Sequence, residues 1–260
     1  MSARTVTVAQ PVWAQLRRRV PGAPADLTLH VLPLSEVAAW VESATGCLSP
    51  EELARARGIQ ETSARELFVV SRVALRHVLG HRLGCAPGDA PVTHDPRTGA
   101  PREVHGRASA VAGWGGDAGP ELGWSPALGA LRPVHFSVSR TAGLVAVVTA
   151  LREVGVDVER LQSEVEADVL LDILHPADRA RLAGLRGRRR RVAVTRAWVR
   201  VEALVKGWQT GLARDPASIN VGTRSRATYG PDWTVGDVRT STRENARLAV
   251  AWRTDPAPQG

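Results

Sequence analysis

The chain has 260 residues, of which 43% are hydrophobic and 23% are charged, and its formal net charge is +8 at pH 7. This composition is ordinary for a globular protein, and it excludes a disordered chain, a collagen-like repeat and a coiled coil. No apolar run approaches the roughly 18 residues that a membrane span requires, and the first residues lack the apolar core of a signal peptide. Because the two cysteines, Cys47 and Cys85, do not form a disulfide framework, we expect a cytoplasmic protein with no membrane partner.

The chain begins with an expected N-terminal arm, residues 1–26, which carries three consecutive arginines and a turn of Pro and Gly. We expect this arm to be loosely packed. Residues 27–32 alternate between apolar and polar side chains and predict a strand, and residues 34–42 predict a short helix. Ser49, followed by Pro and two Glu, is typical of a helix start. Residues 61–83 carry an apolar stripe that predicts a longer helix.

The middle of the chain contains a segment rich in Gly, Ala and Pro, residues 105–130. We interpret this segment as a long loop or insertion. Three strands are expected after it, because apolar residues either alternate with polar ones or run together. These strands cover residues 134–139, 144–150 and 154–159.

The last third of the chain is expected to combine helices with further strands. Residues 165–185 predict a helix that Pro176 interrupts, and residues 195–210 predict a strong helix that ends before a glycine. Between them lies a run of arginines, residues 186–191, which is either a solvated loop or a docking surface for an acidic protein. Strand candidates follow at residues 219–221, 233–235 and 247–252.

This mixture of helices and alternating strands indicates an α+β fold. Two comparable halves that join near residue 150 fit the pattern. We therefore expect an N-terminal subdomain over residues 27–150, which includes the insertion, and a C-terminal subdomain over residues 151–260.

The first motif that could carry chemistry is Gly-x-Asp-x-Glu at residues 155–159. Alternate residues of a strand point to the same face, so Asp157 and Glu159 project together. Two neighbouring carboxylates repel each other unless a cation lies between them, and a hard divalent ion such as Mg²⁺ suits them. The alternative is an exposed strand face with two solvated acids.

The second motif lies on the predicted helix of residues 195–210. Glu202 and Lys206 are spaced i,i+4 and share one face, beside a seam of apolar residues. The pair forms either a simple helical salt bridge or a site where a carboxylate binds a metal or takes a proton while the ammonium faces an anion. All other basic residues are Arg. Lysine has AT-rich codons, so the codon bias of a GC-rich genome explains the absence of other lysines. It does not explain why Lys206 remains.

Together the two motifs are far more specific than either alone. Gly-x-Asp-x-Glu followed by Trp-x-x-x-Glu-Ala-x-x-Lys-x-x-x-x-Gly-Leu at residues 198–212 resembles the Sfp-type 4′-phosphopantetheinyl transferases. The resemblance extends over most of the chain, from Leu27 to Trp252. Residues 71–76 resemble the Arg-x-x-Leu-Arg helix of that family, and residues 135–141 lie where it has Phe-Asn-x-Ser-His-Ser.

The resemblance implies a pseudo-two-fold pair of similar α+β subdomains with the active site between them. The implied activity is a Mg²⁺-dependent transfer of the 4′-phosphopantetheine group of coenzyme A (CoA) to a serine of an acyl- or peptidyl-carrier protein, with release of 3′,5′-ADP. A synthase of secondary metabolite biosynthesis would supply that carrier protein. We expect a monomer that does not bind nucleic acid.

The resemblance also implies roles for individual residues. Mg²⁺ would be held by Asp157, Glu159 and Glu202. Glu202 would take the proton of the serine hydroxyl, and Lys206 would neutralise charge on the pyrophosphate or the leaving group. Positioning and electrostatics supply most of the catalysis in such phosphoryl transfers. The implied CoA-binding residues are Arg55, Arg72, Ser139 and Arg140.

Three positions depart from the family pattern, and at all three the resemblance implies a side chain that interacts with the phosphates of the substrate. The family has lysines in the places of Ala100 and Val201 and a histidine in the place of Arg140, whose charge does not titrate near pH 7. The alternative is therefore a protein with the transferase fold and lost or altered chemistry, which binds CoA or a carrier protein or acts on another biosynthetic substrate. Nucleic-acid binding is a further alternative from the net charge, but no helix-turn-helix, zinc or aromatic RNA-binding motif accompanies the arginines.

Overall fold

The computed structural model of the chain describes residues 16–94, 101–102, 134–209, 214–222, 224, 226–240 and 245–254. The expected insertion at residues 105–130 and the position of Ala100 lie outside these ranges. No helix in the described ranges is long and apolar enough to cross a membrane.

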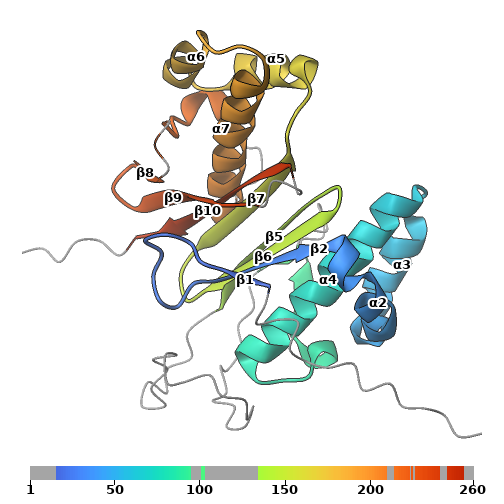
Figure 1. Cartoon of the computed structure of the whole chain (residues 1–260). Coiled ribbons are helices and arrows are strands. Elements are labelled where there is room, and N and C mark those ends of the chain that lie inside the picture. The colour runs from blue at the N-terminus through green and yellow to red at the C-terminus, as the bar shows by residue number, and fades with distance from the viewer. Residues whose placement is uncertain are drawn as a thin grey trace, which may run out of the picture.

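Two antiparallel four-stranded sheets form the centre of the molecule (Figure 1). The first sheet has the order β1 (Arg17–Arg18), β2 (Thr28–Pro33), β6 (Leu144–Ala150) and β5 (His135–Thr141). The second sheet has the order β7 (Val154–Arg160), β10 (Ala246–Arg253), β9 (Trp233–Val238) and β8 (Arg226–Tyr229). A separate short pair consists of β3 (Thr93–His94) and β4 (Pro101–Arg102).

The helices fall into two groups, one for each sheet (Figure 1). The first sheet is accompanied by α2 (Leu34–Ala44), α3 (Pro50–Gly58) and α4 (Thr62–Leu83). The second is accompanied by α5 (Glu164–Ile173), α6 (Pro176–Leu182) and α7 (Gly187–Gly207). Short 3₁₀ turns lie at η1 (Thr45–Cys47), η2 (Pro87–Asp89) and η4 (Pro216–Ser218).

The two halves repeat one topology. In the first half, β2 leads through the long helix α4 to the hairpin β5–β6, and the sheet order is β2-β6-β5. In the second half, β7 leads through the long helix α7 to the hairpin β9–β10, and the sheet order is β7-β10-β9. The α+β prediction with two similar subdomains is therefore confirmed.

The strands alternate their side chains between a helix layer and a shared core between the sheets. On β6, Val145 and Val147 belong to the core under α4, whereas Ala146 and Val148 belong to the core that also contains apolar residues of β7 and β10. On β10, Ala249 belongs to the core under α7, while its neighbours in sequence face the shared core. The layers therefore run helix, sheet, sheet, helix, and burial of these apolar faces holds them together.

The ends of several helices agree with the prediction from the sequence. Ser49 accepts a hydrogen bond from the backbone N–H of Glu52, and the Glu52 carboxylate accepts one from the N–H of Ser49, so the two form a capping box at the start of α3. Gly84 ends α4 in the left-handed conformation, at φ 69°. Pro176 separates α5 from α6 by opening the second helix.

Other predictions need correction. The arginine run at residues 186–191 is not a loop, because α7 begins at Gly187, with Arg186 as its N-cap residue and the other arginines in its first turns. Residues 219–221 follow a 3₁₀ turn and form no strand, whereas β8 was not predicted. The second part of the expected arm is not loosely packed, because Leu16 and Val20 are buried and β1 pairs with β2.

Helix α7 packs directly on the backbone of β7 at Gly155. A Cβ atom on Gly155 would overlap with the carbonyl oxygen of Ala203 and the backbone of Gly207. Only glycine therefore allows this separation between helix and strand, which determines how closely the side chains of α7 approach those of β7.

We predict that Gly155→Ala lowers the free energy of unfolding by about 3 kcal/mol, because neither backbone segment can move without disturbing the core. Urea unfolding followed by circular dichroism measures the change. Gly58→Ala is the matched control, since a Cβ there meets no atom within 4 Å, and it should be neutral or slightly stabilising at the end of a helix. Equal effects of the two substitutions would contradict the close packing.

Candidate functional site

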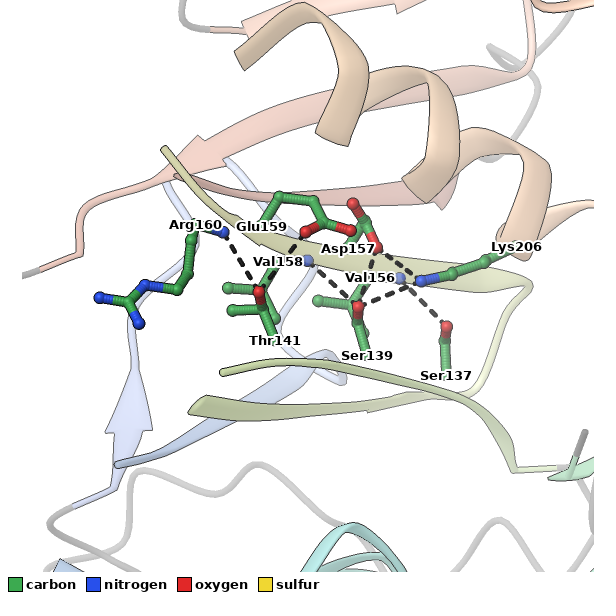
Figure 2. A network of polar contacts seen from close by, with 9 residues as sticks. All are labelled: Ser137, Ser139, Thr141, Val156, Asp157, Val158, Glu159, Arg160 and Lys206. Carbon is green, nitrogen blue, oxygen red and sulfur yellow. Dashed lines mark hydrogen bonds and ion pairs between the residues drawn. The ribbon is translucent and has the colours of Figure 1, made fainter. Parts of the chain in front are cut away.

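The two sheets meet where the edge strands β5 and β7 lie side by side (Figure 2). Hydroxyl groups at alternate positions of β5 accept hydrogen bonds from backbone N–H groups at alternate positions of β7. The bonds run from Val156 to Ser137 Oγ (3.2 Å), from Val158 to Ser139 Oγ (3.2 Å) and from Arg160 to Thr141 Oγ1 (3.3 Å). Side-chain oxygens thus accept the hydrogen bonds of backbone N–H groups along the β7 edge, which would otherwise require a neighbouring strand.

The same hydroxyls orient the two acids of the Gly-x-Asp-x-Glu motif. Ser139 Oγ donates to Asp157 Oδ1 at 2.8 Å, and Thr141 Oγ1 donates to Glu159 Oε2 at 3.4 Å. Asp157 is only 2% exposed, so its carboxylate is held in place by protein groups rather than by solvent. The alternative of two solvated acids on an exposed strand therefore does not describe Asp157.

Helix α7 brings a cation to this carboxylate. Lys206 Nζ lies 2.5 Å from Asp157 Oδ1 and donates to Ser139 Oγ at 3.1 Å. The ion pair of Lys206 is thus with the strand and not with Glu202, one turn earlier on the same helix face. Figure 2 shows that Lys206 and Ser139 both bond the same Asp157 oxygen and also bond each other.

The carboxylates of the site affect one another's protonation. Burial, followed by the nearby Asp157 carboxylate, raises the pKa of Glu159 to about 7, against the opposing effect of Lys206. Burial also raises the pKa of Glu202, with a second contribution from Asp157 and again an opposing one from Lys206. The site therefore holds more negative charge than its one lysine offsets, which is the environment that a divalent cation stabilises.

The residues of this cluster fit Mg²⁺ by donor type. Asp157 Oδ2 is buried and has no hydrogen-bond partner among the described residues, and three carboxylates supply the hard oxygen ligands that Mg²⁺ prefers. Within the described ranges, however, no three His, Cys, Asp or Glu side chains are gathered as a ready ligand set. To bind an ion, the side chains of three neighbouring residues would have to move closer together, namely Asp157, Glu159 and Glu202.

A second cluster gathers three of the predicted CoA-binding residues around the ring of Phe68. The guanidinium carbons of Arg55, Arg72 and Arg140 lie 5.9, 5.1 and 5.8 Å from the ring centroid. Burial lowers the pKa of Arg72 to about 10, although Glu52 opposes this shift. Burial, and then Arg55, lowers the pKa of Arg140. These arginines come from α3, α4 and β5, and their mutual repulsion favours an anion between them.

Strand β5 connects the two clusters. Ser139 faces β7 and contacts Asp157 and Lys206, while the adjacent Arg140 lies near Phe68 on α4. The structure therefore places Ser139 with the acids and not with the arginines. Sequence reasoning missed Ser137 and Thr141, although hydroxyls at every second position of a predicted strand are a readable signal of one polar face.

The positions that depart from the family pattern have different surroundings. Val201 is fully buried in the core under α7, so a lysine there would be enclosed in apolar contacts. Arg200 does not replace the missing charge, because it is 1% exposed and bonds Asp237 through Nε at 2.7 Å. Its Nη1 donates to the carbonyl oxygen of Gly222 at 2.7 Å.

A cavity of about 280 Å³ lies away from both clusters, between α6 and the first half of α7. Each of its three arginines has a carboxylate partner, since Arg196 and Arg200 share Asp237 and Arg181 pairs with Asp178. Because two arginines share one aspartate, the group keeps an excess of positive charge.

Residues 153–251 match the family model of the 4′-phosphopantetheinyl transferase superfamily. The matched segment begins just before β7 and ends within β10, and it includes the cluster of Asp157, Glu159, Glu202 and Lys206. The match covers less than half of the chain, and over this part it confirms the resemblance at the level of the superfamily. No curated protein matches the chain.

We predict that Lys206→Met lowers the free energy of unfolding by about 2–3 kcal/mol in the presence of EDTA, because the buried Asp157 carboxylate loses its cation. Urea unfolding measures this change. In an Asp157→Asn background the same substitution should cost far less, since no charge is left unpaired. A loss that is equal in both backgrounds would show that the ion pair does not stabilise the site.

Proposed function

We propose that the chain is an Sfp-type transferase that moves the 4′-phosphopantetheine group of CoA to a serine of an acyl- or peptidyl-carrier protein and releases 3′,5′-ADP. The observation that carries this proposal is the pair of clusters on either side of β5. One holds three carboxylates and Lys206, and the other holds three arginines around Phe68. A substrate with a pyrophosphate and a separate phosphate monoester suits two such sites.

Asp157, Glu159 and Glu202 would hold Mg²⁺ in this proposal. When bound, the ion would supply positive charge to the pyrophosphate and to the oxygen that leaves. The buried Asp157 Oδ2, which has no hydrogen-bond partner in the part of the chain that the structure describes, supports this assignment. Ser139 would act by orienting Asp157 and Lys206, with no direct contact to CoA required.

Glu202 is the proposed base. The carrier serine oxygen forms a bond to the β-phosphorus of CoA, and the bond from that phosphorus to the bridging oxygen of 3′,5′-ADP breaks. The serine proton goes to a carboxylate oxygen of Glu202, directly or through water, and the ADP oxygen leaves with the electron pair. Burial raises the pKa of Glu202, which favours acceptance of a proton. Lys206 would neutralise charge on the leaving group.

A carrier protein of a secondary metabolite synthase is the proposed acceptor. Arg188 and Arg189 are exposed at the start of α7, where positive charge complements an acidic carrier. We place the reaction in the cytoplasm, with a monomeric enzyme.

The second candidate is a protein of this fold with lost or altered chemistry. The burial of Val201 and the engagement of Arg200 with Asp237 favour it, because neither residue can supply the lysine charge that the family pattern has on this helix. Calorimetric binding of CoA without transfer would distinguish this candidate from an active transferase.

We predict that the protein, with CoA and Mg²⁺, adds the mass of phosphopantetheine to an apo-carrier protein, as measured by mass spectrometry. Glu202→Ala should slow the transfer at least about 100-fold, because the base is removed. Glu164→Ala is the control, since Glu164 is exposed in the first turn of α5. If a panel of apo-carriers stays unmodified, the proposal of transfer is wrong.

We also predict that Arg140→His makes the KM for CoA depend on pH. Histidine loses its charge as pH rises from 6 to 8, so KM relative to the original protein should rise about tenfold over that range. Arg140→Lys stays charged and should show no such relative change. Steady-state kinetics at several pH values provide the measurement. A flat ratio for Arg140→His would show that this charge does not contact CoA.

A further inference from the structure

The cavity between α6 and the first half of α7 is lined by two chemically different sets of residues. Its volume of about 280 Å³ lies at the small end of the range for small-molecule sites. The apolar lining residues are Leu182, Leu185, Ala193 and Ala197. The basic lining residues are Arg181, Arg196 and Arg200. Apolar surface combined with a few polar groups is typical of a site for a small organic molecule.

Asp237 serves two of these arginines at once. Arg200 is 1% exposed, and its Nε and Nη2 donate to the two carboxylate oxygens of Asp237 at 2.7 and 2.8 Å. Arg196 contacts the same Asp237 Oδ2 through Nε at 2.6 Å and through Nη2 at 2.5 Å. Arg196 Nη1 has no hydrogen-bond partner among the described residues, and the side chain is 33% exposed. A ligand can therefore reach this N–H group.

Arg181 also keeps N–H groups that a ligand can use. Its Nη1 donates to Asp178 Oδ1 at 2.9 Å, and Asp178 Oδ2 accepts from the backbone N–H of Val221 at 3.0 Å. Within the ranges that the structure describes, Arg181 Nε and Nη2 have no hydrogen-bond partner, and this side chain is 48% exposed. Three arginines with two aspartate partners leave this group with one positive charge in excess.

We propose that this cavity is a second binding site, which takes a small carboxylate with an apolar body. The carboxylate would accept from the open N–H groups of Arg181 and Arg196, because a guanidinium fork matches the planar geometry of a carboxylate. A single negative charge balances the excess of one. The apolar body would lie against Leu182, Leu185 and Ala193, which removes apolar surface from water. The inference does not depend on the proposed transfer.

Isothermal titration calorimetry with benzoate, benzamide and acetate tests both parts of the proposal. Benzoate should bind at least about tenfold more tightly than benzamide, which has no charge to pair with the arginines. It should also bind at least about tenfold more tightly than acetate, which lacks the apolar ring. Equal binding of benzoate and either of the other two probes would overturn the proposal, as would no binding of benzoate at millimolar concentration.

Two substitutions test whether benzoate binds in this cavity. Arg196→Met removes one donor and leaves the pair of Arg200 and Asp237 in place, so it should weaken benzoate binding about tenfold. Ala193→Leu keeps every charge but fills part of the cavity, and it should weaken binding at least as much. Arg179→Met is the matched control, since Arg179 is exposed on α6 and does not line the cavity.

Unchanged benzoate binding in both cavity variants, or an equal loss in Arg179→Met, would contradict the assignment to this cavity. If Arg196→Met does not fold, Ala193→Leu decides the location of the site and the comparison of benzoate with benzamide decides the role of charge.

Discussion

The row of hydroxyls between β5 and β7 is the contact on which the site depends. Each sheet ends at one of these strands, and an unsatisfied buried N–H group costs about 1–3 kcal/mol. Ser137, Ser139 and Thr141 remove that cost by accepting from β7. Backbone pairing would join the sheets equally well, but it would leave no hydroxyl proton to donate to a carboxylate. Side-chain acceptors therefore join the subdomains and at the same time orient Asp157 and Glu159.

The approach of α7 to β7 determines which cation can reach that row. Because Gly155 has no side chain, the helix backbone lies against the strand. Lys206 then contacts both Asp157 and Ser139. A compact ammonium fits this confined position, whereas a planar guanidinium needs more room and more acceptors. This difference gives a physical reason for one lysine to remain in a chain whose other basic residues are all arginine.

The sequence predicts the parts of the fold that depend on local patterns. Periodicity correctly predicts β6 and most of β7, and the two-residue repeat places Asp157 and Glu159 on one face. The contacts of Ser139 and the ring of Phe68 could not be predicted, because both depend on residues distant in sequence. The prediction of a loop for the arginines at the start of α7 was wrong for another reason. Positive charge is unfavourable at a helix start, and packing of the rest of the helix outweighs that local preference.

The pleat of β5 couples the two clusters. Successive side chains of a strand point to opposite faces, so Ser139 and Arg140 reach different clusters from adjacent residues. A shift in the register of β5 by one residue would exchange these directions and lose both clusters at once. Pairing with β6, in which Ser139 lies opposite Ala146, fixes that register. The buried apolar face of β6 therefore controls the separation between the acids and the arginines, although none of its residues takes part in either cluster.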